Sequence, residues 1–239
     1  MPSRLFVAGG KEIVSQEGTT QGDNLAMSFY ALGTVPLQND LRVVQPNVKQ
    51  VWLADDATGA GKLAHLKQWW NAIISHGSKL GYFVNESKSW LILKDESKLE
   101  EAKQLFAGTS IKFTTSGKRH LGSAIGSEDF RTEYVTKKVA SWCEEVEKLT
   151  EFAKSQPHAA FASYIHGEQH RFTYFMRTIP GMEAYLKPLD DVITYKLLPA
   201  ILGAGVSETE RQLYSLPIRD GGLSMSVLTE LSQRQFNPT

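Results

Sequence analysis

The feature that most constrains the fold of this chain is a change of pattern between residues 126 and 130. Before it, short apolar runs alternate with glycine-rich and polar turns, which predicts short strands mixed with helices. After it, apolar residues recur at helical spacing over long stretches. This predicts helices over 130–152, 159–177 and 182–202 and a shorter one near 208–213, with Pro157, Pro180 and Pro188 near the breaks. We therefore expect an α+β chain with two domains, residues 1–128 and an all-helical region 129–239.

The first domain is expected to contain short antiparallel strands packed with helices. Gly9-Gly10 between apolar segments predicts a hairpin over 4–15, and helical spacing predicts helices over 24–34, 62–76 and 96–106. We expect Pro36 to limit the first of these helices, since proline cannot donate within a helix. The remaining predicted features are strands at 50–54 and 90–93, a small-residue turn at 57–61, and a hairpin 111–125 that turns at Ser116-Gly117-Lys118.

Composition narrows the class of protein. With 239 residues and 41% hydrophobic content, the chain can bury a core. Lys+Arg and Asp+Glu number 26 each, so no overall basic excess marks it as a non-specific nucleic-acid binder, although a basic surface can be local. The single cysteine, Cys143, excludes an intrachain disulfide and suits a reducing compartment. No signal-peptide or membrane-spanning pattern is found, so we expect a soluble, intracellular chain without a membrane partner.

Two adjacent carboxylates end the apolar run Val51-Trp52-Leu53-Ala54. A strand sends neighbouring side chains to opposite faces, so only a tight bend lets Asp55 and Asp56 approach one cation. Hard oxygen ligands of this kind suit Mg²⁺, which takes one or two carboxylates together with phosphate oxygens and waters. The alternative is a polar turn or a helix cap, as expected for Asp190-Asp191, which precedes a helical pattern.

Three further motifs occur in a fixed order around this pair. Glycines allow a close backbone approach to a ligand, Gln21 offers both donor and acceptor atoms, and Lys88 is a compact charge suited to phosphate. Taken alone, each motif can also be interpreted as a simple turn or as a solvated surface segment without a binding function. The motifs are Gly18-Thr19-Thr20-Gln21-Gly22-Asp23, then Gly81 to Lys88 with Asn85 between them, and finally His120-Leu121-Gly122.

Taken in this order, the four motifs resemble the palm of a reverse transcriptase, of the type found in non-long-terminal-repeat retroelements and related mobile elements. The resemblance covers residues 17–126 and implies a partial polymerase palm followed by a helical thumb. It implies that Gln21, Gly22 and Ala54 contact the nucleotide and that Asp55 and Asp56 bind Mg²⁺ in two-metal nucleotidyl transfer. It further implies that Lys88 contacts the leaving pyrophosphate and that His120, Leu121 and Gly122 grip the primer. RNA template, DNA primer and deoxynucleotides would be the partners.

The sequence also departs from that family. Reverse transcriptases use a further aspartate from an earlier strand, whereas here Glu12 and Glu17 are the only acids before the Gln21-Gly22 loop, and Asn24 stands where the family usually has proline. Basic fingers are also missing. We therefore expect a partial polymerase that does not polymerise alone and whose missing segment would lie upstream. Two alternatives stay open: a non-enzymatic nucleic-acid-binding or assembly remnant, and, ranked low, a nuclease using Asp55 and Asp56.

Overall fold

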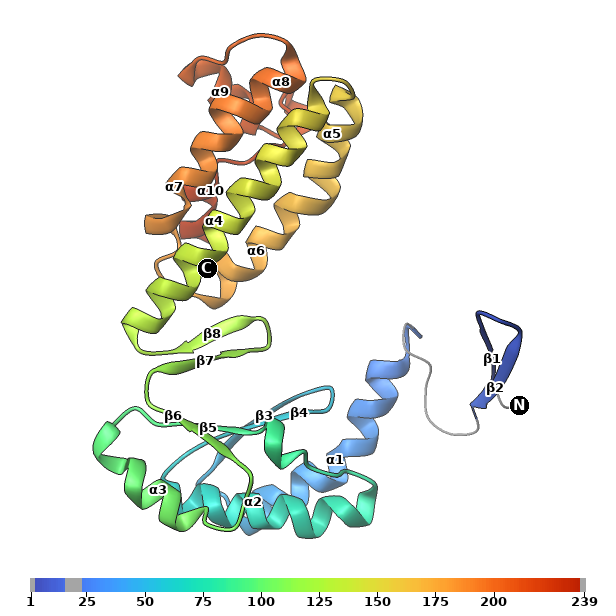
Figure 1. Ribbon diagram of the computed structural model, residues 1–239, viewed down its shortest axis with the longest axis vertical. Helices are drawn as coiled ribbons and strands as arrows, with labels where there is room; N and C mark the ends of the chain where they lie inside the picture. The colour runs from blue at the N-terminus through green and yellow to red at the C-terminus, as the bar shows by residue number, and fades with distance from the viewer. Residues whose placement is uncertain (1–2, 16–22, 237–239) are drawn as a thin grey trace. The chain divides into compact units, whose positions relative to one another are not determined.

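The computed structural model describes residues 3–15 and 23–236 and has an α+β architecture in which helices predominate (Figure 1). The chain forms two compact units. The first comprises residues 1–89 and 97–112, and the second comprises residues 90–96 and 113–239. The change from short strands to long helices falls where β8 (Ser123–Gly126) gives way to α4 (Glu128–Ala153). In the described ranges, no helix combines the length and apolar character needed to cross a membrane.

The first unit combines two antiparallel hairpins with three helices. Its elements are β1 (Ser3–Val7), β2 (Lys11–Ser15), α1 (Ala26–Val44), β3 (Lys49–Leu53), β4 (Asp56–Ala60), α2 (Leu63–Gly77), 3₁₀ turns at Ser78–Leu80, Glu86–Lys88 and Glu96–Lys98, and α3 (Leu99–Leu105). The predicted hairpin around Gly9-Gly10 is confirmed, with Val7 paired to Lys11.

The second unit is a helical bundle with a hairpin at its start. Strand β5 (Trp90–Ile92) pairs with β6 (Lys112–Thr114), and β7 (Gly117–His120) pairs with β8. The remaining elements are α4, α5 (Pro157–Ser163), a π-helical segment Tyr164–Glu168, α6 (Gln169–Thr178), α7 (Glu183–Val192), a second π-helical segment Ile193–Leu197, α8 (Leu198–Leu202), α9 (Glu208–Ser215), a 3₁₀ turn Ile218–Asp220 and α10 (Leu228–Phe236).

Two prolines expected to interrupt helices lie inside them. Helix α1 continues through Pro36, and α7 continues through Pro188, so both predicted breaks are wrong. A proline inside a helix costs about 3 kcal/mol through a lost hydrogen bond and a steric clash. In α1 this cost is offset because Leu37 and Leu41, directly after Pro36, are fully buried against α2.

The second unit is held together by one apolar core along α4. The helix begins at Ser127, whose side chain accepts a hydrogen bond from the Phe130 amide at 3.2 Å. Six positions of α4 are buried at intervals of three or four residues, which places them on one face: Val135, Val139, Trp142, Val146, Thr150 and Ala153. Helix α7 lies alongside α4, and α10 packs against α6 and α7 (Figure 1). Side chains of α6, α7 and α10 share one apolar core with α4.

The hairpin of the second unit turns at a different place from the one predicted. Strand β6 pairs with β5, not with the strand that follows it, and the tight turn is Leu121-Gly122 between His120 and Ser123. Gly117 and Lys118 belong to β7, and Thr115-Ser116 joins two separate sheets. The Gly126 backbone explains this arrangement: it lies so close to Ser116 and Gly117 that a Cβ there would be 2.3 Å from the Ser116 carbonyl oxygen.

Candidate functional site

The two adjacent carboxylates lie at the turn of the β3–β4 hairpin. Leu53 pairs with Asp56, so Ala54 and Asp55 form a two-residue turn. The predicted strand ending at the acids is confirmed, but the predicted turn over 57–61 is wrong because those residues belong mostly to β4. Ala54 has φ +51°, a left-handed conformation that costs a residue with a side chain about 1–2 kcal/mol. The chain therefore stores strain at this turn.

The strand that leads to the turn is half-buried, although its sequence is apolar at four consecutive positions. Val51 and Leu53 are 65% and 52% exposed, while Gln50 and Trp52 face the core of the first unit. Period-two alternation explains this: one face of β3 packs against α1 and α2, and the other face meets solvent. Asp55 and Asp56, beyond the packed face, are both exposed.

A chain of hydrogen bonds fixes the inner face of β3. The Gln50 side chain donates to the Gln38 carbonyl at 2.9 Å and accepts from the indole nitrogens of Trp52 at 3.0 Å and Trp69 at 3.3 Å. Gly59 on β4 leaves room for Trp69, since a Cβ there would lie 2.8 Å from the indole ring. The hairpin is thus attached to α1 through Gln38 and to α2 through Trp69.

Tyr82 contacts the acidic turn from the loop that follows α2. Its hydroxyl donates to the main-chain carbonyl of Asp55 at 2.8 Å, and its ring meets the Trp52 ring edge-on with centroids 5.3 Å apart. Burial, then the neighbouring Tyr30 and the negative charges of Asp55 and Asp56, raise the pKa of Tyr82 to about 12. Burial and Asp55 also raise the pKa of Tyr30. The surroundings of the turn are therefore negative and aromatic.

The donor set of this turn suits a divalent cation that also binds phosphate. Within the described part of the chain, neither carboxylate has a hydrogen-bond or ion-pair partner through its side chain. Two free, exposed carboxylates are what Mg²⁺ takes from a protein when phosphate oxygens and water complete its shell. No group of three or more histidine, cysteine or acidic residues gathers anywhere among the described residues, so the pair stands without a third protein ligand.

Lys88 ends a short 3₁₀ turn in the same unit. The Asn85 side chain accepts a hydrogen bond from the Lys88 amide at 3.3 Å and caps this turn, which gives the Asn-x-x-Lys spacing a structural reason. The carboxylate of Glu86 holds the Ser110 amide at 3.0 Å, which fixes the turn against the start of the next segment. Lys88 is exposed at the end of this turn.

The tip of the β7–β8 hairpin is held by two tyrosines of the second unit. Leu121 and Gly122 both have positive φ, +48° and +85°. The Tyr174 hydroxyl on α6 donates to the Leu121 carbonyl, and the Tyr134 hydroxyl on α4 donates to the Gly122 carbonyl at 2.9 Å. Both carbonyls of the strained tip are therefore fixed from the helical bundle.

Basic side chains follow the strand that leads to this tip. Lys118 lies over the Trp90 ring with its ammonium 4.1 Å from the centroid, a cation–π contact, and Arg119 is exposed. His120, the last residue before the tip, is partly buried. Lys118 and Arg119 are neighbours on a strand, so their side chains point to opposite faces of the hairpin, and each can offer one positive charge to a phosphate.

The structure places the predicted site residues in two groups. Ala54, Asp55, Asp56 and Lys88 belong to the first unit, and the three residues of the predicted primer grip, His120, Leu121 and Gly122, belong to the second. Gln21 and Gly22 lie outside the described residues.

Sequence reasoning missed the tyrosines that hold both turns: Tyr82, Tyr134 and Tyr174. Their spacing carries no signal for these contacts, because each hydroxyl reaches a carbonyl more than ten residues away along the chain.

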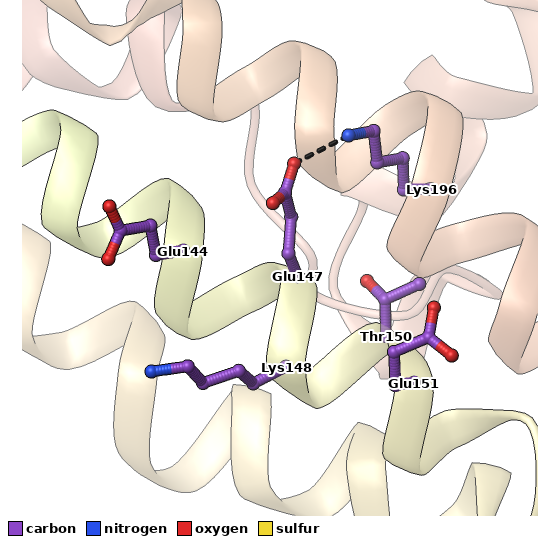
Figure 2. A pocket seen from close by; sticks show the side chains of 6 residues that line it. All are labelled: Glu144, Glu147, Lys148, Thr150, Glu151 and Lys196. Atoms are coloured by element: carbon purple, nitrogen blue, oxygen red, sulfur yellow. Dashed lines mark hydrogen bonds and ion pairs between the residues drawn. The ribbon is translucent and has the colours of Figure 1, made fainter.

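A surface depression of the second unit lies away from both groups of predicted site residues. It has a volume of about 530 Å³ and is lined by three glutamates, two lysines and Thr150 (Figure 2). Glu147 and Lys196 form an ion pair across it. Opposite charges compensate one another there and the side chains are solvated, so this depression offers no set of groups directed at one ligand.

Comparison with known proteins identifies no relative: no family model, curated protein or solved structure matches this chain.

Proposed function

We propose that this chain carries part of the catalytic centre of an RNA-directed DNA polymerase, with Asp55 and Asp56 as its metal-binding carboxylates. The observation that carries the proposal is the acidic turn itself. A strained two-residue turn presents two adjacent, exposed carboxylates whose side chains have no partner among the described residues. A positive φ at the first central residue is usual in a two-residue hairpin turn, so the two exposed carboxylates, and not the backbone conformation, support the proposal.

The proposed roles follow from what each side chain can do. Asp55 and Asp56 would hold Mg²⁺, which when bound supplies charge stabilisation for an in-line displacement at phosphorus. Lys88, exposed and carried on a capped turn, offers an ammonium charge to a pyrophosphate leaving group. Ala54 has only a methyl group at the turn, which leaves space for a nucleotide beside the carboxylates.

The β7–β8 hairpin is the proposed contact for the end of a DNA primer on an RNA template. Arg119 and Lys118 offer positive charge, and Leu121-Gly122 offers a backbone held in one shape. Phosphate contacts position a nucleic acid without reading its sequence, which is what a polymerase requires of its primer. Deoxynucleoside triphosphates would be the substrates.

A second function, nucleic-acid binding without catalysis, is favoured by one observation. The described residues hold no third acidic or histidine ligand near Asp55 and Asp56. A remnant that has kept the hairpin and the helical bundle could bind a duplex and leave the acidic turn unused. The two functions differ in whether metal binding at the turn matters.

Metal binding tests the leading proposal. Mn²⁺, which can be followed by electron paramagnetic resonance, replaces Mg²⁺ in a titration of the full chain. We expect Asp55→Asn and Asp56→Asn each to weaken Mn²⁺ binding about tenfold or more, because each removes a charged ligand. The matched control is Asp191→Asn, which alters the other Asp-Asp pair, where Asp191 pairs with Lys187. Equal Mn²⁺ affinity in all three variants would contradict the proposal.

Binding of an RNA–DNA hybrid tests the hairpin. We expect Arg119→Ala to weaken binding and to lower the slope of log affinity against log salt by about one, as loss of one phosphate contact does. Fluorescence anisotropy at several salt concentrations measures both quantities. Arg219→Ala, which removes an 85% exposed arginine elsewhere in the second unit, is the control and should leave the slope unchanged. Hybrid binding that Asp55→Asn does not affect, with no primer extension, would favour the non-catalytic function.

A further inference from the structure

A pocket of the second unit lies between the first turns of α4 and the segment that leads into α7. Its volume of about 400 Å³ falls within the range of pockets that hold small molecules. Part of its wall is apolar and comes from Val135, Ile179 and Pro180. Because α4 and α7 pack directly against each other within this one compact unit, the shape of the pocket is set by the helical bundle alone.

Arg131 brings a positive charge to this pocket. The side chain is partly buried, and among the described residues its guanidinium has no hydrogen-bond or ion-pair partner. Its Nε is shielded from solvent and still lacks an acceptor, whereas the terminal nitrogens keep access to solvent. A buried donor without an acceptor is costly, and a guanidinium binds an oxygen anion best through two parallel hydrogen bonds. The free guanidinium therefore indicates an anionic ligand.

Two hydroxyl groups also line the pocket. Thr132 Oγ1 on α4 and the Tyr185 hydroxyl on α7 form a hydrogen bond of 2.9 Å, which joins the two helices across the pocket wall. Either oxygen can be the donor in this pair, so the other hydroxyl keeps a proton that it can donate elsewhere. An oxygen anion in the pocket would thus find a hydroxyl donor in addition to the guanidinium.

The charges around the pocket limit the charge of its ligand. Glu128 also lines it, is exposed, and has no ion-pair partner within the described part of the chain, although Arg131 stands three residues further along the same helix. A doubly charged phosphate would meet one cation and one anion there. A single arginine instead suits a single carboxylate, whose hydrocarbon body can pack against the apolar part of the wall.

We propose that this pocket binds the carboxylate of a small organic acid. Arg131 would hold the carboxylate oxygens, and the hydroxyl pair of Thr132 and Tyr185 would donate to one of them. The apolar wall would contact the rest of the ligand. The site uses no residue of the acidic turn or of the β7–β8 hairpin, so it stands or falls independently of the proposed polymerase function.

Benzoate is the probe for this site, and nuclear magnetic resonance is the measurement. The Nε–H group of Arg131 is shielded from solvent, so its ¹H–¹⁵N signal reports binding at the guanidinium itself. Titration of the full chain with benzoate at constant ionic strength should shift this signal and the Thr132 amide signal along one saturable curve. Benzamide has the same shape without the charge and should bind about tenfold more weakly or less.

Three substitutions test the proposed contacts, followed through the Thr132 amide. Arg131→Gln should weaken benzoate binding about tenfold or more, because it removes a charge-assisted hydrogen bond. Tyr185→Phe should weaken it about two- to fivefold through loss of one neutral donor. Glu128→Gln should strengthen it, since a negative charge is removed from the pocket. Arg219→Gln, at an 85% exposed arginine of the same unit, is the control and should bind as the wild type does.

The outcomes decide the proposal. Saturable binding that is lost in Arg131→Gln and kept in Arg219→Gln would support it. Equal benzoate affinity in these two variants, or equal affinity of the wild type for benzoate and benzamide, would overturn it. Tighter binding of inorganic phosphate than of benzoate would overturn the carboxylate assignment. If Arg131→Gln does not fold by circular dichroism, the Nε–H shift of the wild type and the Glu128→Gln variant decide, and a missing shift or weaker binding contradicts the proposal.

Discussion

Replacement of Arg211 by alanine is expected to destabilise the second unit by about 3–5 kcal/mol, the usual cost of removing one partner from a buried charged network. Arg211 is 3% exposed and its guanidinium donates to Thr194 Oγ1 at 3.0 Å, to the Met225 carbonyl at 2.7 Å and to the Ser226 carbonyl at 3.0 Å. It connects α9, the second π-helical segment and the approach to α10. Urea unfolding followed by near-ultraviolet circular dichroism measures the change.

The charge left behind explains the size of this effect. Asp190, 6% exposed, lies 3.9 Å from Arg211 and accepts from the Leu228 and Thr229 amides at the start of α10. Without Arg211, that buried carboxylate loses the buried cation 3.9 Å away. Arg211→Lys should not rescue stability, because an ammonium cannot reproduce a planar fork of donors. Arg219→Ala, at an exposed arginine, should change stability by less than about 0.5 kcal/mol, and a loss below 1 kcal/mol for Arg211→Ala would contradict the prediction.

Gly126→Ala is the second substitution with a large expected effect, a loss of about 3 kcal/mol or more together with opening of the β7–β8 hairpin. An added Cβ would lie 2.3 Å from the Ser116 carbonyl oxygen and 2.4 Å from the Gly117 Cα. Both are backbone atoms, so no side chain can rotate to make room. Amide hydrogen exchange over residues 117–126 should accelerate, and the melting temperature of the second unit should fall.

Its matched control is Gly167→Ala, where an added Cβ meets nothing within 4 Å. Because alanine is favoured over glycine inside a helix by about 0.5–1 kcal/mol, this variant should be neutral or slightly stabilised. If the hairpin is the nucleic-acid contact that we propose, Gly126→Ala should also reduce binding of the RNA–DNA hybrid, and Gly167→Ala should not. A Gly126→Ala protein with unchanged exchange over 117–126 would contradict the structural reason.

Sequence patterns correctly predicted the strands and helices that form because of nearby residues. The glycine pair at 9–10 marks the first hairpin, and the apolar period over 130–152 marks α4, since both depend on backbone freedom or on one buried face. The strand before Asp55 was also predicted, because apolar β-formers end there at two acids. The last helix, α10, has no counterpart in the prediction, and strand β4 lies where a turn over 57–61 was predicted.

The errors all concern features that distant residues decide. The Ala54-Asp55 turn requires an alanine at positive φ, a conformation that residue type alone argues against. Pro36 and Pro188 remain within helices because the flanking residues Leu37, Leu41, Leu186 and Leu189 are fully buried. The pairing of β6 with β5 follows from partners that lie about twenty residues apart.

Sequence alone determined most of the helices, the first hairpin, and the pair of adjacent carboxylates at the end of a strand. The tertiary structure decided which side chains hold those features in place. Tyr82, Tyr134 and Tyr174 each donate a hydrogen bond to a turn that is remote in sequence. Periodicity reports which face of an element is buried, but a hydroxyl reaching a distant carbonyl depends on how the elements pack, and packing leaves no local pattern.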